Sequence, residues 1–191
     1  MINSIKINSF KQKAGLLVLL LFVPLLALFA QQNPLPDLDL KTLDGEIIKA
    51  SDLETPGTPL VIIFWNESDY ESYSQLEAVN DAYEEYMSEM NIKMIAIYVG
   101  KSGTYDHIKP LVDGNNWEFD VYVDVNGSLQ RSMCLQGSPH TLLYDQSMSL
   151  VSCYPGYCKG TDALLQQQVN ELLLVGNYHS GSDFSGGPGG F

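Results

Sequence analysis

The chain has 191 residues, with 23 acidic and 10 basic side chains and a formal net charge of −13 at pH 7. Because so much negative charge repels nucleic acid and anionic lipid, neither is expected as a partner. Hydrophobic residues make up 45% of the chain, which is enough to bury the core of one domain of ordinary size.

Residues 1–30 have the layout of a secretory signal peptide. Lys6, Lys11 and Lys13 precede an uncharged apolar stretch, Ala14 to Ala30, that ends in a small residue. The alternative is an uncleaved membrane anchor, although the stretch is at the short end of the spanning range. Without this segment the chain keeps all 23 acidic residues but only 7 basic ones, a formal charge of −16.

The apolar pattern of the remaining chain predicts strands that alternate with helices. Strands are expected at 38–40, 47–48, 60–65, 92–99, 119–123, 141–144 and 150–154, a short turn or helical cap at 51–53, and helices at 69–90, 104–112, 129–135 and 162–175. Buried strands that alternate with helices indicate an α/β domain over 31–175, with a central sheet covered on both faces. The Gly/Ser-rich segment 176–191 is predicted to be a disordered tail.

Three short motifs follow one another along this domain: "LPDLDLKTLDGEIIKASDL" at 35–53, "PLVIIFW" at 59–65 and "GSPHTLLYD" at 137–145. Together they resemble the thioredoxin-like superfamily, in its branch of TlpA/ResA-type extracytoplasmic thiol–disulfide oxidoreductases related to the AhpC/TSA redoxins. The resemblance implies a thioredoxin-like α/β fold, with a central mixed sheet flanked by helices and an N-terminal β-hairpin extension. It also implies a cis-proline at Pro139.

The reactive cysteines of that family have no counterpart in this chain. The family's Phe-Trp-Ala-x-Trp-Cys-x-x-Cys aligns with residues 64–72, which puts Asp69 and Ser72 at the two cysteine positions. A carboxylate cannot form a mixed disulfide and a hydroxyl is not redox active, so the family's dithiol chemistry is not expected here. Instead, Ser68 and Glu71 have the spacing of a capping box at the start of a helix.

The resemblance implies a groove between this helix start and the cis-proline loop, where family members hold a polypeptide. Its lining residues in this chain are expected to be Trp65, Tyr70, Ser138, Pro139 and His140. The first functional hypothesis is therefore a non-catalytic protein- or peptide-binding member of a thiol-redox family, with an extracytoplasmic polypeptide as partner and no cofactor. The resemblance and the leader together place it in the bacterial periplasm, or anchored in the membrane and facing the periplasm.

Two further hypotheses remain open. Cys153 and Cys158 flank a Pro-Gly turn and are expected to form a disulfide, which leaves Cys134 as a buried free thiol. Alternatively, the domain is a thiol–disulfide oxidoreductase that uses one of these three non-standard cysteines. A third hypothesis is a cation site built from Glu67, Asp69, Glu71 and His140. No metal-ligand spacing in the sequence supports such a site.

Overall fold

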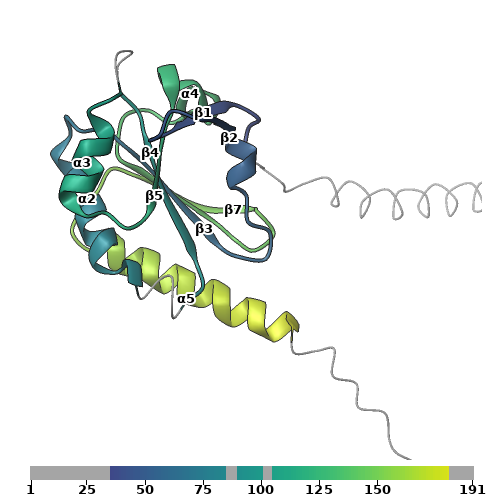
Figure 1. Cartoon of the computed structure of the whole chain (residues 1–191). Helices are drawn as coiled ribbons and strands as arrows, with labels where there is room; N and C mark the ends of the chain where they lie inside the picture. The colour runs from purple at the N-terminus through teal and green to yellow at the C-terminus, as the bar shows by residue number, and fades with distance from the viewer. Residues whose placement is uncertain (1–34, 85–89, 101–104, 181–191) are drawn as a thin grey trace, which may run out of the picture. The chain divides into compact units, whose positions relative to one another are not determined.

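The structure, a computed structural model, describes residues 35–84, 90–100 and 105–180. Its elements in chain order (Figure 1) are β1 (Asp39–Thr42), β2 (Ile47–Lys49), the 3-10 helix η1 (Ala50–Leu53), β3 (Leu60–Trp65), α2 (Tyr70–Asp81), β4 (Lys93–Tyr98), α3 (Ile108–Asn115), β5 (Asp120–Val123), the 3-10 turn η3 (Val125–Gly127), α4 (Ser128–Ser132), β6 (His140–Tyr144), β7 (Leu150–Pro155) and α5 (Thr161–Ser180). The expected signal peptide lies outside the described residues.

All seven strands form one mixed sheet in the order β2-β1-β5-β4-β3-β6-β7. The three central strands, β5, β4 and β3, run parallel to one another. The pairs β2–β1, β1–β5, β3–β6 and β6–β7 are antiparallel. The hairpin β1–β2 extends the sheet at one edge and the hairpin β6–β7 at the other. This confirms the expected α/β fold, including the N-terminal β-hairpin extension.

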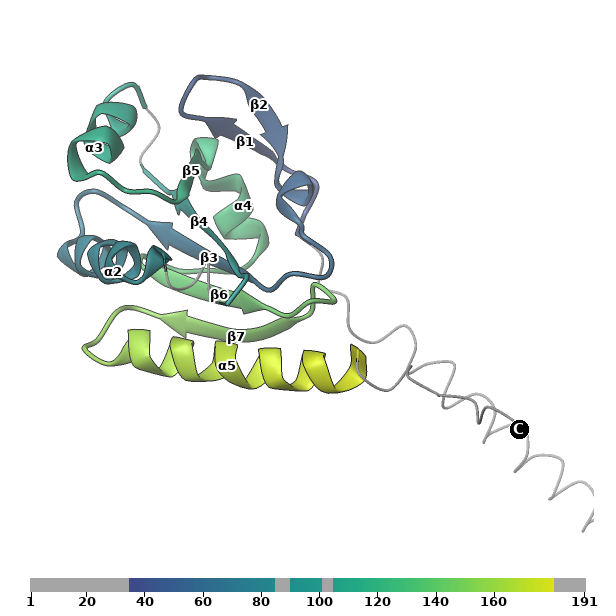
Figure 2. The same cartoon turned by 60° about the horizontal axis from the view of Figure 1, so that its bottom comes forward.

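Strand β3 lies at the centre of two hydrophobic cores. Val61, Ile63 and Trp65 face one core, and the alternate side chains of the strand face the other. All six of its residues are buried, which explains why the strand reads as a continuous apolar run. Helices α2, α3 and α5 contribute to the first core and η1 and α4 to the second, so both faces of the sheet are covered (Figures 1 and 2).

The boundaries of helices α3 and α5 differ from the expected ones. Helix α3 begins at Ile108, so Pro110 falls in its first turn, where a missing N–H has no helical partner to lose. The helix ends at Asn115 and is capped by Asn116, which adopts the left-handed conformation (φ 53°). Helix α5 continues to Ser180, past the expected end at 175, because one internal glycine costs a helix only about 1 kcal/mol.

Helix α2 begins at Tyr70 and ends at Asp81, whereas a helix over 69–90 was expected. Residues 85–89 and 181–191, which include most of the expected tail, lie outside the described part of the chain. Across the described ranges, no helix combines the length and the apolar character needed to cross a bilayer.

Asp124 connects the sheet to the short helix α4. Its carboxylate is fully buried and accepts three hydrogen bonds, from Ser128 Oγ (3.1 Å), Leu129 N (3.1 Å) and Gln130 N (2.8 Å). The side chain of Gln130 then donates to the carbonyl of Gly137 (2.7 Å) in the loop that leads to β6. One buried carboxylate thus fixes both α4 and the approach to the expected cis-proline.

We expect Asp124→Ala to lower the free energy of unfolding by about 2–3 kcal/mol, because it leaves one buried and one half-buried N–H group without an acceptor. Urea denaturation followed by circular dichroism measures the loss. The control is Asp113→Ala, at an exposed position in α3, which should change the value by less than about 0.5 kcal/mol. Equal effects of the two substitutions would contradict the structural role of Asp124.

Candidate functional site

Helix α2 starts directly after the central strand β3, and Asp69 is its N-cap. The Asp69 backbone is extended (φ −112°, ψ 115°), and its Oδ1 accepts from the Glu71 backbone N–H at 3.1 Å. The expected capping box of Ser68 with Glu71 is therefore wrong. Ser68 belongs to the preceding turn, where its N–H donates to Asn66 Oδ1 at 2.8 Å.

The two positions aligned with the family's reactive cysteines are hydrogen-bonded to each other. Ser72 Oγ donates to Asp69 Oδ2 at 2.9 Å, and Ser138 Oγ reaches the same oxygen at 3.3 Å. Ser72 is fully buried and also accepts from the Asn66 backbone N–H at 3.3 Å. Because its hydroxyl is enclosed and engaged on both sides, Ser72 cannot serve as a nucleophile. Asp69 acts here as a structural acceptor.

The loop before β6 contains the expected cis-proline, since the Ser138–Pro139 peptide bond is cis. Its shape is held by hydrogen bonds on both sides. His140 Nδ1 donates to the Gly137 carbonyl at 3.2 Å, and the Pro139 carbonyl accepts from Gly156 N at 2.7 Å. The His140 side chain is thus buried and fixes the loop from within.

The five residues expected to line a groove differ in their access to solvent. Tyr70 is 83% exposed and Ser138 is half-buried, whereas Trp65, Pro139 and His140 are buried. The Trp65 ring instead packs edge-on against other aromatic rings, those of Tyr73, Tyr98 and Trp117. Tyr70 and Ser138 are therefore the side chains that a partner can reach, and the other three lie inside the protein.

A third segment, which sequence reasoning missed, lies against this site. Gly156 N donates to the Pro139 carbonyl, and Tyr157 N donates to Glu71 Oε2 at 3.4 Å. Gly156 has a φ of 74°, and a Cβ at this position would lie 3.5 Å from Glu71 Oε2. The Pro155-Gly156 pair was the one feature of the sequence that indicated a turn in this segment. We call residues 69–72, 137–139 and 156–157 together the junction.

The side chains that were considered for a cation site have separate partners. Glu67 Oε1 lies 3.5 Å from His107 Nε2, while Glu71 contacts Tyr157 and Asp69 contacts the two serines. Burial, with the nearby Glu67 carboxylate, raises the pKa of Tyr98. In the described ranges no group of three or more His, Cys, Asp or Glu side chains is placed to hold a metal ion.

All three cysteines are free and exposed in the structure, and the expected Cys153–Cys158 bond is not formed. Ser152 and Tyr154 both hydrogen-bond to Gln168 of α5, so the strand alternation turns Cys153 toward the opposite face of the sheet. Cys158 lies just before α5. Cys134 follows α4 in the left-handed conformation (φ 58°), and the expectation that it is buried is wrong.

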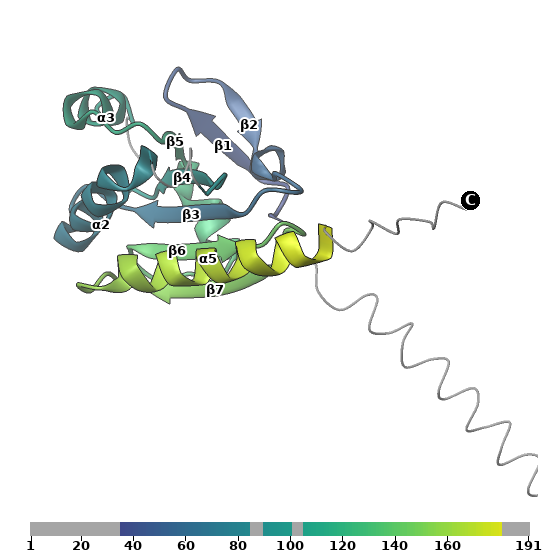
Figure 3. The ribbon, with the colours of Figure 1, turned by 90° about the horizontal axis from the view of Figure 1, so that it is seen from below.

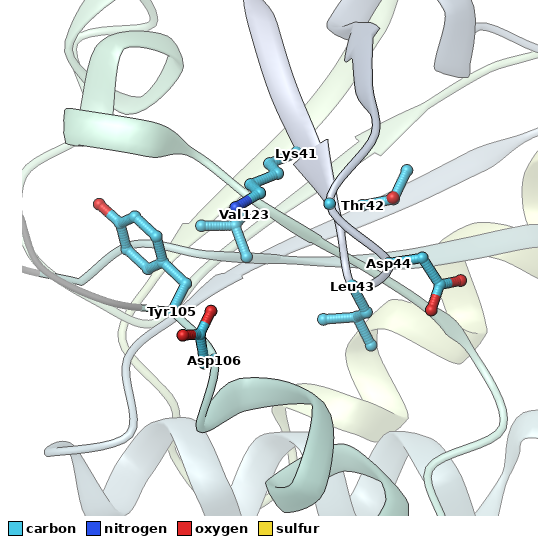
Figure 4. Close-up of a pocket in the computed structure, with 8 residues that line it drawn as sticks. Lys41, Thr42, Leu43, Asp44, Tyr105, Asp106 and Val123 are labelled. Atoms are coloured by element: carbon cyan, nitrogen blue, oxygen red, sulfur yellow. The ribbon is translucent and has the colours of Figure 1, made fainter.

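A pocket of about 210 Å³ opens elsewhere, between the β1–β2 turn and the segment before α3 (Figure 4). Its lining residues are Lys41, Thr42, Leu43, Asp44, Gly45, Tyr105, Asp106 and Val123. The Asp44 carboxylate at its rim pairs with Lys109 of α3. None of the junction residues lines this pocket, so the two are separate features of the molecule.

We expect Asp69→Ala to lower the free energy of unfolding by about 1–2 kcal/mol, as the loss of an N-cap usually does. The matched control is Glu77→Ala, at an exposed position of the same helix, which should be nearly neutral. Both values come from urea denaturation. If Asp69→Ala proved as neutral as the control, the carboxylate would not be the anchor of this site.

The chain is similar to a known protein family and to several solved structures. Residues 32–155 match the sequence profile of the AhpC/TSA family. A thioredoxin-like protein from Porphyromonas gingivalis is 30% identical, with a TM-score of 0.68 over 78% of this chain and 97% of its own. A candidate thiol:disulfide interchange protein, DsbE, from Chlorobium tepidum is 18% identical (TM-score 0.63, 75% and 97% covered). The exposed lipoprotein thioredoxin of Streptococcus pneumoniae is 20% identical (TM-score 0.58, 72% and 100% covered). No curated protein matches the chain at a significant level.

Proposed function

This chain belongs to the AhpC/TSA family, and on that premise we propose that it is an exported thioredoxin-like protein that binds polypeptide at the junction without dithiol chemistry. The observation that carries the proposal is the hydrogen bond between Asp69 and Ser72. These two positions hold the reactive pair in the family's redox members. Here they hold a capping carboxylate and a buried hydroxyl, neither of which exchanges disulfides.

The backbone beside the cis-proline supports a binding role. In the described part of the chain, neither the N–H nor the C=O of Ser138 has a hydrogen-bond partner. Both groups are available to an extended polypeptide, which could add to the protein by strand-like pairing. Tyr70 stands exposed on the first turn of α2 and offers the large aromatic contact that often dominates such interfaces.

The charges of the junction favour a cationic partner. Asp69 is the N-cap of α2 and Glu71 lies in its first turn, and the chain as a whole carries a strong negative charge. Lys- or Arg-containing segments are therefore attracted and acidic ones repelled, an effect that weakens as salt is added.

Export is part of the proposal. It is supported by the basic and then apolar layout of residues 1–30, and by the description of one structural neighbour as an exposed lipoprotein. Sequencing the N-terminus of the protein recovered from its native host would locate the cut after residue 30, if the segment is a cleaved signal peptide.

We expect no thioredoxin-type reductase activity from Asp69 and Ser72. In an insulin reduction assay with dithiothreitol, a variant that lacks Cys153 and Cys158 should run no faster than the blank, since the junction itself contains no cysteine. A clear acceleration by this variant would refute the proposal.

The matched test restores the dithiol. Asp69→Cys combined with Ser72→Cys should produce measurable insulin reduction, because the first cysteine then sits at the start of a helix where a thiolate is stabilised. Circular dichroism checks that the variant is folded. A folded but inactive double variant would show that these positions do not correspond to the family's reactive pair.

Binding is tested with a permanently unfolded, carboxymethylated protein and with labelled peptides of basic or acidic composition. We expect the basic peptides to bind more tightly, and Tyr70→Ala to raise their Kd about tenfold, as the loss of an aromatic anchor does. Ile47→Ala removes another exposed apolar side chain, on β2, and should leave the Kd unchanged. Fluorescence anisotropy measures both. No binding, or equal effects of the two substitutions, would exclude the proposed surface.

A further inference from the structure

The pocket between the β1–β2 turn and the segment before α3 is lined by two opposite charges that do not pair with each other. Lys41 of β1 is half-buried, and Asp106, just before α3, is exposed. Neither takes part in the ion pairs formed among the described residues. In Figure 4 the Lys41 amino group points toward the side of the pocket formed by Tyr105 and Asp106. An ammonium and a carboxylate therefore share one cavity, and both are available to a ligand.

The third charged residue that lines the pocket is already neutralised. The Asp44 carboxylate pairs with Lys109 of α3, and in Figure 4 it points away from Lys41 and Asp106. The same pair ties the β1–β2 turn to α3, so it holds two walls of the pocket together. Among the lining residues, Lys41 and Asp106 are thus the charges that a ligand meets.

The rest of the pocket offers apolar and aromatic surface. Val123 of β5 is buried and Leu43 is half-buried, and both line the cavity. The Tyr105 ring packs edge-on against Tyr98, and its hydroxyl accepts from Asn126 N at 3.5 Å. These contacts fix the ring as one wall. A ligand with an apolar part can therefore bury it here while its charged groups reach Lys41 and Asp106.

This pocket is remote from the β7–α5 loop of the junction. Strand β7 forms one edge of the sheet, whereas β1 is next to the strand at the other edge. Figures 2 and 3 both show the β1–β2 hairpin and α3 on the opposite side of the sheet from β7 and α5. A small ligand in the pocket and a polypeptide at the junction would therefore not compete for space.

The size and charges of the pocket limit what it can hold. Its volume of about 210 Å³ is below that of pockets that enclose drug-sized ligands, so one small molecule fits. Asp106 repels a simple anion and Lys41 repels a simple cation, whereas a zwitterion satisfies both. A free α-amino acid with an apolar side chain combines the two charges with an apolar group. A polypeptide does not, because its charged termini are far apart.

We propose that this pocket is a binding site for a free apolar α-amino acid. The carboxylate of the ligand pairs with Lys41 Nζ and its ammonium with the Asp106 carboxylate, beside the Tyr105 ring. The apolar side chain contacts Leu43 and Val123. Because both charged groups of the protein keep some access to water, each pair contributes modestly, and we expect a Kd on the order of 1 mM.

L-leucine and two analogues that each lack one charge test the proposal. N-acetyl-L-leucine has no ammonium, and L-leucinamide has no carboxylate. NMR follows binding through the backbone amide shifts of residues 41–45, 105–106 and 123, at low ionic strength. We expect L-leucine to shift these amides with saturation and both analogues to bind about fivefold more weakly or worse. No saturable shift up to about 10 mM L-leucine, or equal binding of either analogue, would overturn the proposal.

Two substitutions with charge-matched controls test the residues. Lys41→Met keeps the alkyl stem, and it should raise the Kd of L-leucine about fivefold and abolish its advantage over L-leucinamide. Asp106→Asn should likewise abolish the advantage over N-acetyl-L-leucine. Lys159→Met and Asp81→Asn remove the same charges at other exposed positions and should leave the Kd unchanged. If a control weakened binding as much as its counterpart, net charge rather than the pocket would be responsible, and the proposal would be wrong.

The competing possibility is that Lys41 and Asp106 pair with each other in solution and close the pocket. A double-mutant cycle on thermal stability, without ligand, distinguishes the two. We expect Lys41→Met, Asp106→Asn and their combination to shift Tm additively, each single change by less than about 2 °C. A coupled, non-additive loss of stability would show that the two side chains bind one another, and the site would not be available to an amino acid.

Discussion

The Asp69 carboxylate is the interaction on which the rest of the site depends. It accepts hydrogen bonds from the first turn of α2, from Ser72 and from Ser138 in the cis-proline loop. Two segments that are far apart in the sequence are therefore fixed to one side chain. In a dithiol protein this position must stay free to react. Here the position holds a carboxylate that accepts three hydrogen bonds, so it fixes its neighbours in place.

The scaffold around this carboxylate delivers its partners from several directions. Strand β3 is buried on both faces, and Asn66 and Asp69 follow its C-terminal end, where α2 begins. On the other side, Asp124 holds the start of α4, and Gln130 of that helix donates to the Gly137 carbonyl in the cis-proline loop. The β7–α5 loop closes the third side through backbone hydrogen bonds. Each wall is thus held by hydrogen bonds between segments that are far apart in the sequence.

Much of the fold could be predicted from the sequence because its signals are local. The apolar run of β3, the three motifs and the Ser138-Pro139 pair each specify their own element, and the structure contains them all. Boundaries were less accessible, because they depend on competing turns. Ser68 has the spacing of a helix cap, but its N–H donates to Asn66 Oδ1 in the preceding turn. A helix was expected over 104–112, whereas α3 begins at Ile108 and has Pro110 in its first turn.

The site itself was only half accessible from sequence. Alignment placed Asp69, Ser72 and Pro139, but it could not show that Trp65 and His140 are buried. Contacts between segments, such as the one between Tyr157 and Glu71, span 86 residues and leave no local pattern. The same holds for the cysteines, whose pairing seemed plausible from the turn between them. The faces of the strand and helix, which a turn motif does not encode, decide which way each thiol points.

The hydrogen-bonded pair Asp69 and Ser72 also limits which substitutions these two positions tolerate. A change to cysteine at position 69 alone removes the acceptor shared by Ser72 and Ser138, while a larger sulfur at position 72 alone must enter a fully enclosed space. Each single substitution is therefore expected to lower the free energy of unfolding. The two positions are therefore coupled through one shared oxygen, and substitutions at them are expected to be non-additive in stability.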